Sequence, residues 1–368
     1  MASGPNAPVT VAILGAAGTI APAIVRDLAV SDEVERMYLL DLDGDGAATV
    51  AERHGAGKAL ASAVDARNPR ALARRIDGID VLVNTASYRV NLEAMRACAA
   101  VACDYLDLGG LYWMTRRQLE LSADFERAGR LAVLGIGSSP GKTNLMALRA
   151  VKELGAADPV EAIDVAAAGR DPQAGSGFSP PYAVQTLVDE LTLAPVVLRA
   201  GAPVEIEPLA PGGAIEFGEP IGSAETIYTL HSELATFGDS FGCREASFRL
   251  SLAPALLARL TELVGAPADE LGRAAREAAP PSSETTSVHL VSARGQSGRT
   301  VRMRAVSRPH FGLGGSIVST AAPAAALVRL LARGQLAATG ALAPERCIEP
   351  EAMFAELKTR GASFSLEG

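Results

Sequence analysis

The chain has few cysteines, and none of them has the spacing of a metal site. The four thiols are scattered along the sequence: Cys98, Cys103, Cys243 and Cys347. Because neither a metal motif nor a disulfide framework is visible, we expect reduced thiols, no bound metal and a cytoplasmic protein. Cys98 and Cys103 fall in an apolar passage between a helix and a strand, which favours a place in the core over a catalytic role.

An excess of positive charge is also missing. The formal net charge is −8, with 34 lysines and arginines against 42 carboxylates, and no basic patch is visible. Proteins that bind nucleic acid usually carry such a patch, because neutralising phosphates dominates their affinity. We therefore expect no nucleic-acid partner.

Long apolar runs are absent as well, and we expect no secretory leader. The sequence has no window of about 18 uninterrupted apolar residues, so it predicts no membrane span. Residues 1–9 lack the basic and apolar regions of a signal peptide. With 368 residues, of which 48% are hydrophobic, the chain is typical of a globular protein of two or three domains.

Near the N-terminus, an apolar run leads into a glycine-rich turn and a helical pattern. Residues 11–14 are apolar, Gly15 and Gly18 follow, and residues 20–28 have helical periodicity. Gly15 would permit a sharp turn, Gly18 would let a pyrophosphate approach the backbone, and Ala21 is small enough for close helix packing. The helix N-terminus would offer N–H groups to an anion.

A carboxylate at the end of the next strand supports a dinucleotide site. Asp41 ends the apolar run 37–40 and stands 23 residues after Gly18, near the usual place of a ribose-binding acid. Asp43 follows, and residues 42–46 contain no lysine or arginine. A 2′-phosphate would meet two carboxylates there, so we expect NAD as cofactor, with NADP less favoured. The alternative is a βαβ unit with an unoccupied turn.

The first third of the chain alternates strands and helices, which predicts an α/β fold with a doubly wound parallel Rossmann sheet. The carboxyl ends of such strands share one edge, where ligands bind. The residues expected to bind the cofactor all lie at this edge or in the glycine turn: Gly15, Ala17, Gly18, Thr19, Ile20, Asp41, Asp65, Asn84 and Ser87.

A second glycine-rich turn, residues 135–143, ends in Gly-Lys-Thr but fails as a nucleotide-binding P-loop. The motif needs four residues between its first glycine and the Gly-Lys pair. Counted back from Gly141, Gly137 leaves three residues and Gly135 leaves five. The turn would still lie at the ligand edge and open a helix.

The regular alternation of strand and helix patterns ends after this turn. Short strand patterns with little helix between them, including a hairpin over residues 286–306, predict a second α+β domain with a mostly antiparallel sheet. We expect a dinucleotide-binding Rossmann domain over residues 1–137 and 312–368, and a substrate-binding and dimerisation domain over residues 138–311.

Taken together, these segments resemble the saccharopine dehydrogenase-like oxidoreductases, and within them the lysine 6-dehydrogenase branch. The resemblance covers most of the chain and rests on the order and spacing of several segments: residues 11–21, Asp65, residues 81–84 with the helix 91–101, residues 104–109, the Pro-Gly turn 135–141, residues 228–233, and Pro344-Glu345. Similar proteins often carry an Asp or Ala before the Pro-Gly, where this chain has Ser138-Ser139.

The resemblance implies NAD(P)-dependent chemistry at a C–N bond of an amino acid or polyamine. It also implies a homodimer formed through the second domain's sheet, with the C-terminal segment returning to the first domain. The favoured reaction is lysine 6-dehydrogenase-like oxidation of an amine to an imine or semialdehyde that can cyclise. The alternatives are a saccharopine-type or cyclic-imine reductase, and a redox-neutral, cyclodeaminase-like enzyme or sensor that keeps its NAD.

Amine oxidation needs a base, because the nitrogen must be neutral as hydride leaves the carbon. His231 is the best candidate, since imidazole titrates near neutrality. Glu233 follows at i+2, so on a strand both side chains would face one side and Glu233 could orient the ring. Tyr88 and Asp107 lie at strand ends and complete the catalytic candidates. The structural alternatives are a solvent-facing pair, a loop tyrosine and a turn cap.

The substrate contacts are expected from Ser138 and Ser139 in the Pro-Gly turn, from Lys142, and from Arg244 as a carboxylate fork. The alternative for Lys142 is an ordinary surface lysine of a first helical turn. His289, His310 and His54 read as structural or solvated histidines.

Overall fold

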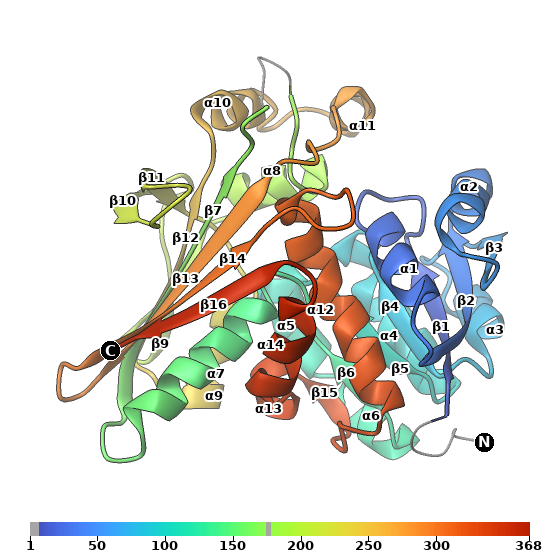
Figure 1. The fold of residues 1–368 in the computed structure, drawn as a ribbon, viewed down its shortest axis with the longest axis horizontal. Helices are drawn as coiled ribbons and strands as arrows, with labels where there is room; N and C mark the ends of the chain where they lie inside the picture. The colour runs from blue at the N-terminus through green and yellow to red at the C-terminus, as the bar shows by residue number, and fades with distance from the viewer. Residues whose placement is uncertain (1–6, 174–177) are drawn as a thin grey trace. The chain divides into compact units, whose positions relative to one another are not determined.

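The computed structural model describes residues 7–173 and 178–368, which form two compact units. The first unit is Met1–Lys142 with Thr320–Glu349, and the second is Thr143–Ser319 with Pro350–Gly368. Residues 1–6, on which the expectation of no leader partly rests, lie outside the described residues. Figure 1 labels the elements of both units.

A seven-stranded parallel sheet forms the first unit, in the order β15-β6-β5-β4-β1-β2-β3. Its strands are β1 (Val9–Leu14), β2 (Val34–Asp41), β3 (Ala59–Ala63), β4 (Val81–Asn84), β5 (Asp104–Asp107), β6 (Leu131–Val133) and β15 (Gly340–Leu342). The order places β1 between β4 and β2, so their carboxyl ends share one edge of the sheet. The predicted Rossmann sheet is confirmed.

Helices connect these strands as the alternating pattern predicted. They are α1 (Ala21–Ala29), α2 (Gly44–His54), α3 (Pro69–Ile76), the 3₁₀ turn η1 (Tyr88–Val90), α4 (Asn91–Ala100), α5 (Leu111–Leu119), α6 (Ser122–Ala128) and α13 (Pro344–Cys347). The start of α3 is determined by residues next to it in the sequence. Asn68 caps the helix, its Oδ1 accepting a hydrogen bond from the N–H of Ala71 (3.1 Å), and Pro69 occupies the first turn.

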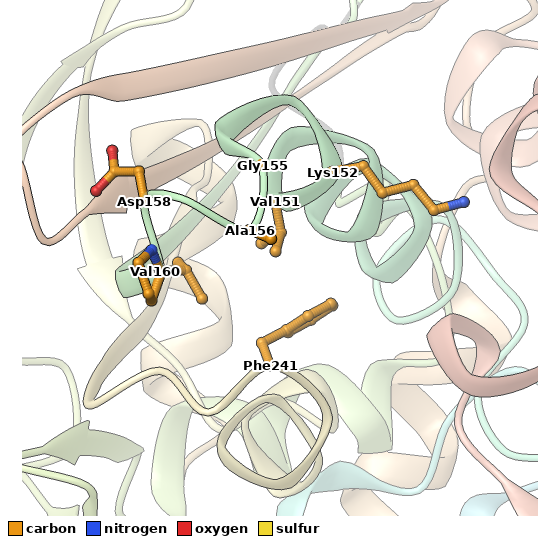
Figure 2. Close-up of a pocket in the computed structure, with 8 residues that line it drawn as sticks. Val151, Lys152, Gly155, Ala156, Asp158, Val160 and Phe241 are labelled. Carbon is orange, nitrogen blue, oxygen red and sulfur yellow. The ribbon is translucent and has the colours of Figure 1, made fainter.

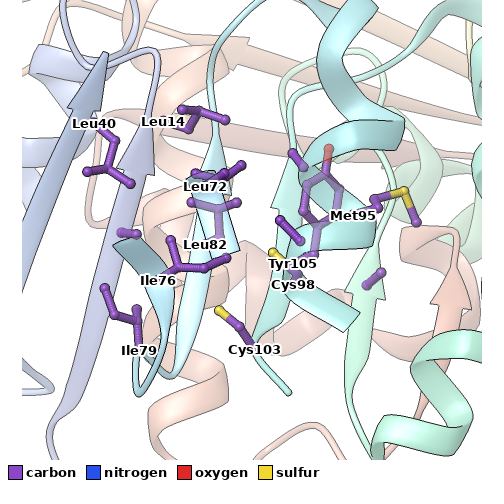
Figure 3. Close-up of a cluster of buried hydrophobic side chains, with 14 of the residues drawn as sticks. Leu14, Leu40, Leu72, Ile76, Ile79, Leu82, Met95, Cys98, Cys103 and Tyr105 are labelled. Atoms are coloured by element: carbon purple, nitrogen blue, oxygen red, sulfur yellow. The ribbon is translucent and has the colours of Figure 1, made fainter. Parts of the chain in front are cut away.

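The core of this unit lies between the sheet and the helices α3 and α4. Figure 3 shows Leu14 and Leu82 from the sheet beside Leu72 and Met95 from the helices, with both cysteines of this region among them. Cys98 and Cys103 are fully buried, as expected for core thiols. Burial raises the pKa of Cys98 well above its usual range, which disfavours its reactive thiolate.

Helix α12 (Gly315–Ala332) is long and apolar enough to cross a membrane, but 83% of it is buried inside the protein. Within the first unit, Arg329 near its end forms a buried ion pair with Asp27 of α1 (3.1 Å). A helix so enclosed has the environment of a core helix.

The second unit is built on a nine-stranded mixed sheet, in which β10-β11-β12-β7-β13-β14-β16 lie in sequence and β8 and β9 lie off this path. The strands are β7 (Val160–Arg170), β8 (Val196–Arg199), β9 (Ala202–Glu205), β10 (Pro211–Glu216), β11 (Ser223–Tyr228), β12 (Glu245–Ser251), β13 (Thr286–Gly295), β14 (Thr300–Ser307) and β16 (Ala362–Glu367). Among the described strands of this sheet, only the pairing of β12 with β7 is parallel, so the sheet is mostly antiparallel, as predicted.

The helices of this unit include α7 (Lys142–Leu154), which begins at the boundary, and the amphipathic α8 (Val184–Thr192). The remainder are η2 (Glu233–Ala235), α9 (Phe237–Phe241), α10 (Pro254–Glu262), α11 (Ala268–Glu277) and α14 (Pro350–Lys358). Apolar faces of α8, α10 and α11 share one core cluster.

The unit boundaries differ from those expected at residues 137 and 312. The chain passes into the second unit after Lys142, returns to the first at Thr320, and leaves it again after Glu349. Residues 350–368, expected in the Rossmann domain, belong to the second unit, because β16 pairs with β14 along six residues. The last strand completes the second sheet by hydrogen bonds that no local pattern specifies.

Candidate functional site

The glycine turn after β1 has the backbone geometry that its sequence predicts. Gly15 has a φ of 79°, and its N–H donates to the carbonyl of Leu40 at the end of β2 (2.8 Å). A Cβ on Gly15 would lie 2.5 Å from the backbone nitrogen of Ala86, so only glycine fits there. Ala21 is fully buried at the start of α1, which allows the close packing of helix on sheet.

The residues after Gly15 form an open cradle. Ala17, Gly18 and Thr19 are exposed, whereas Ile20 is buried at the start of α1. Among the described residues, a Cβ on Gly18 would meet only Gly15 O within 4 Å, at 3.1 Å. A ligand phosphate can therefore approach the backbone at Gly18, and the turn fits a dinucleotide.

Asp41 at the end of β2 is tied to this cradle. Its Oδ2 accepts a hydrogen bond from the N–H of Ala17 (2.9 Å), and its Oδ1 accepts one from the N–H of Asp43 (2.9 Å). Asp43 in turn caps α2 by accepting from the N–H of Gly46 (3.0 Å). The carboxylate predicted to bind the ribose is thus held beside the turn that would bind the pyrophosphate.

Asp65, the other carboxylate expected at the cofactor, follows β3 and pairs with Arg67. Arg67 donates to both of its carboxylate oxygens, with a shortest distance of 2.7 Å, and the pair is exposed. This pairing lowers the pKa of Asp65, chiefly through the side-chain hydrogen bond from Arg67. A surface pair of this kind contributes little stability.

Beyond β4, the expected site residues separate into buried and accessible ones. Asn84 is 1% exposed, and its Nδ2 donates to Asn91 Oδ1 (2.9 Å) and to the Tyr105 hydroxyl (3.2 Å), so its amide is used inside the protein. Ser87 is exposed and caps η1. Tyr88 is half-buried, with the Arg89 guanidinium 5.4 Å from the centre of its ring. Ser87 and Tyr88 thus remain accessible for a ligand.

Asp107 ends β5 at the centre of a buried hydrogen-bond network. Its Oδ1 accepts from the backbone N–H groups of Gly109 (2.9 Å) and Gly135 (2.7 Å). Its Oδ2 accepts from side chains of three elements: Gln118 (2.6 Å), Tyr105 (3.0 Å) and Asn91 (3.2 Å). Burial raises the pKa of Asp107, and the hydrogen bonds act against this rise. The arrangement favours a structural role, since this carboxylate organises the turns after β5 and β6.

We expect Asp107→Asn to destabilise the first unit by about 2 kcal/mol, because an amide nitrogen would face the amides of Gln118 and Asn91 and leave buried donors unpaired. Asp104→Asn is the matched control on the same strand: its Oδ1 accepts a backbone bond from Leu131 (2.9 Å), which an amide oxygen preserves, and it loses only a partly exposed 3.8 Å ion pair with Arg130 among the described contacts. Urea unfolding of the two variants measures the difference. An Asp107→Asn protein as stable as the wild type yet inactive would instead place Asp107 in the chemistry.

The Pro-Gly turn uses its own backbone groups internally. The N–H of Gly137 donates to Pro140 O (2.8 Å), and the N–H of Lys142 donates to Gly137 O (2.9 Å). Ser138 Oγ lies 3.3 Å from Thr320 Oγ1, and Ser139 precedes a cis peptide bond to Pro140. This short closed turn differs from a phosphate-binding loop, in agreement with its spacing.

Lys142 is not the ordinary surface lysine that its sequence position allowed. It begins α7 and is 1% exposed, and burial lowers its pKa to about 7. A lysine with this pKa exchanges protons near neutral pH, so Lys142 has the properties of an acid–base or substrate-binding group.

In the second unit, His231 and Glu233 come together, but not on a strand as predicted. β11 ends at Tyr228, His231 lies in the following loop, and Glu233 begins η2. His231 Nδ1 is 3.2 Å from Glu233 Oε2, and both residues are buried. The loop and η2 bring the two side chains into the contact that was expected from a strand. Because both residues are buried, they do not form the solvent-facing pair that was the structural alternative.

Neighbouring elements fix both members of this pair. Glu233 Oε1 accepts a 2.8 Å hydrogen bond from the Thr143 hydroxyl in the first turn of α7. The imidazole of His231 stacks on Phe248 of β12, with ring centroids 3.5 Å apart and planes at 18°. Among the described residues, His231 Nε2 has no hydrogen-bond partner. The ring is therefore held in place with one nitrogen available for proton transfer.

Sequence reasoning missed three contributors to this cluster: Thr143, Tyr182 and Glu190. Glu190 lies on α8 and is 4% exposed, and its Oε2 is 3.9 Å from His231 Nε2. The Tyr182 hydroxyl donates to the same oxygen (2.6 Å). The available signal was the Asp189-Glu190 doublet, two acids on the helical stretch 184–191 whose remaining pattern is largely apolar.

The other predicted groups lie elsewhere in their units. Arg244, expected as a carboxylate fork, is exposed just before β12. His289 is buried in β13, with Nδ1 3.4 Å from Ser287 Oγ, and His310 forms an isolated bridge with Leu313. His54 ends α2.

The second unit also has a cavity of about 310 Å³, and its lining differs from the residues of the His231 cluster. Its walls come from the end of α7, the start of β7 and Phe241 of α9. In Figure 2 the Lys152 ammonium and the Asp158 carboxylate point away from Val151 and Phe241. Its lining includes no residue of the His231 cluster, so this cavity is not the candidate active site.

Comparison with known proteins agrees with the sheet and the glycine turn. Residues 11–133 match the family model of the saccharopine dehydrogenase NADP binding domain. This match supports a nicotinamide dinucleotide as cofactor and an oxidoreductase as the class of enzyme.

Among solved structures, apo saccharopine dehydrogenase (L-Glu forming) from Saccharomyces cerevisiae is similar over 98% of this chain and 100% of its own, with 14% identity and a TM-score of 0.71. A substituted meso-dapdh from Clostridium tetani E88 with DAP covers 94% and 96%, with 13% identity and a TM-score of 0.48, which is too low to support an argument. The chain thus has a fold similar to that of saccharopine dehydrogenase, and its residues 11–133 match the nucleotide-binding domain model of that family.

Proposed function

We propose that the protein uses NAD to oxidise a C–N bond of an amino acid, with lysine 6-dehydrogenase-like oxidation of a side-chain amine as the favoured reaction. The observation that carries this proposal is the buried imidazole of His231, whose Nδ1 faces Glu233 at 3.2 Å. In the described part of the chain its Nε2 has no hydrogen-bond partner. A histidine oriented by a carboxylate is a general base suited to an ammonium group.

The bound dinucleotide would supply the hydride acceptor. The residues of the chain then have two tasks. The turn at Gly15 and Gly18, with Asp41, holds the cofactor. His231 takes one proton from the substrate ammonium at Nε2, so that the nitrogen is neutral when hydride leaves the adjacent carbon. Glu233 stabilises the imidazolium that results, and the product imine can add water or cyclise.

The preference for NAD rests on the end of β2. Asp41 and Asp43 both place carboxylates there, and Asp41 is linked to the cradle through Ala17. A 2′-phosphate would be repelled by these charges. Arg67, the nearest basic residue after β3, is already paired with Asp65. These contacts favour NAD even though the matching domain family is described as NADP-binding.

We expect the purified protein to reduce NAD when a basic amino acid is supplied, and to do so more efficiently than with NADP. Absorbance of the reduced nicotinamide, measured with NAD and a panel of basic amino acids and with NADH plus keto acids and amines, tests both points. A flat trace in both panels with NAD still bound would favour the redox-neutral alternative. A preference for NADP above about tenfold in kcat/KM would refute the role given to Asp41.

A further inference from the structure

A second buried carboxylate faces His231 from the side opposite Glu233. Glu190, near the end of α8, has its Oε2 3.9 Å from His231 Nε2 and accepts a 2.6 Å hydrogen bond from the Tyr182 hydroxyl. Glu233 Oε2 is 3.2 Å from the other ring nitrogen, Nδ1. The imidazole thus lies between two carboxylates, one at each nitrogen.

The separation of 3.9 Å between Glu190 and His231 is too long for a hydrogen bond but short for two opposite charges. The ring cannot turn away freely, because it stacks on Phe248 at 3.5 Å. Glu190 itself is held by Tyr182. The Glu190 carboxylate can therefore stabilise a positive charge on the imidazole without movement of either group.

We propose that Glu190 is a positioning residue that stabilises the Nε2-protonated form of His231 and so sets the pH at which His231 exchanges a proton with the substrate nitrogen. This step rests on the function proposed above. In the step, the N–H bond of the ammonium breaks, the proton binds the Nε2 lone pair, and the Glu190 carboxylate stabilises the positive charge of the resulting imidazolium across 3.9 Å.

The charges around the ring support this role. The titratable groups that act on His231 are Glu233 from η2 and Glu190 from α8, whereas Tyr182 and Asp189 act on Glu190. Burial alone would lower the pKa of His231, but Glu233 and then Glu190 act against it, and the net pKa is raised. Burial raises the pKa of Glu190, while His231 and the Tyr182 hydrogen bond oppose that rise.

The direct test is an NMR titration of protein labelled with ¹⁵N-histidine, in which only four imidazoles give signals. We expect Glu190→Gln to lower the titration midpoint of His231 by about one pKa unit, because it removes a facing charge and keeps the shape. Glu190→Asp, which keeps the charge, should restore part of the shift. His231→Gln identifies the signal.

Asp189→Asn is the matched control. Asp189 is a buried acid on the same helix, and its Oδ1 accepts from Gln185 (2.9 Å), a bond that asparagine preserves. Its substitution should leave the His231 midpoint nearly unchanged. If Glu190→Gln fails to fold, Tyr182→Phe replaces it: losing the hydroxyl favours neutral Glu190, so the midpoint should move in the same direction by a smaller amount. An unmoved midpoint in the folded variant, or an equal shift in Asp189→Asn, would overturn the proposal.

The pH profile of kcat/KM then tests the substrate step. For amine oxidation the base must be unprotonated, so activity rises with pH through the pKa of His231, and Glu190→Gln should move that rise to lower pH. If the NMR midpoint moves but the wild type oxidises no amine, the contact stands and the proposed function fails. If the wild type is active and neither midpoint moves, the proposed function stands and the role of Glu190 is refuted.

Discussion

Replacing His231 by alanine is expected to lower the turnover number by a factor of about 10² to 10⁴ while leaving the affinity for NAD nearly unchanged. The reason is that the ring is the proposed base. Glu233 at Nδ1 and the stacked ring of Phe248 hold it in place within the second unit. The dinucleotide cradle belongs to the first unit, so removal of the imidazole takes away proton transfer without altering the turn at Gly15. Steady-state kinetics and equilibrium binding of NAD measure the two effects.

His289→Gln is the control for loss of a buried histidine. His289 is 4% exposed in β13 of the same unit, but its Nδ1 lies near Ser287, which is not part of the His231 cluster. This variant should retain most of its turnover. Unchanged turnover in His231→Ala would remove His231 from the chemistry and would point to Lys142, whose pKa of about 7 also suits proton transfer.

Gly15→Ala is expected to destabilise the first unit by about 4 kcal/mol and to abolish dinucleotide binding. Two costs add: a non-glycine residue at a φ of 79° is strained, and its Cβ would lie 2.5 Å from the nitrogen and 2.7 Å from the Cα of Ala86. These neighbours are backbone atoms of the segment after β4, so they cannot move without disturbing the sheet edge. Thermal unfolding and NAD binding report the two losses.

Gly18→Ala is the matched comparison, because Gly18 is not among the glycines of positive φ and its Cβ would meet only Gly15 O, at 3.1 Å, among the described residues. We expect its stability to stay within about 1 kcal/mol of the wild type, with weaker NAD binding because the methyl group occupies the open side of the cradle. Equal stability of the two variants would show that the Gly15 conformation is not required.

The geometry of the glycine turn was predictable from the sequence. Gly15, Gly18 and Asp41 lie where their spacing placed them, because a strand, a tight turn and a helix are specified by short-range patterns. Asp107 was also located correctly at a strand end. Its hydrogen bonds to Gln118 and Asn91 could not be foreseen, because those side chains come from other helices.

The acid–base half was predictable only in part. The spacing of His231 and Glu233 indicated a pair, although the structure forms it through a loop and η2 instead of a strand. Thr143 contacts Glu233 from 90 residues away, and Tyr182 and Glu190 reach the cluster from the region of α8. Such contacts depend on packing between elements distant in sequence, which periodicity does not describe.

The sequence alone determined the Rossmann sheet, the glycine cradle with Asp41 and the mostly antiparallel second sheet, since each follows from local periodicity and turn chemistry. Only the tertiary structure decided that β16 joins the second sheet, that Asp107 is enclosed by hydrogen bonds and that His231 lies between Glu233 and Glu190. The physical reason is the same in each case. Burial and side-chain convergence are set when separate elements pack, and the charge state of a buried group depends on its neighbours in space.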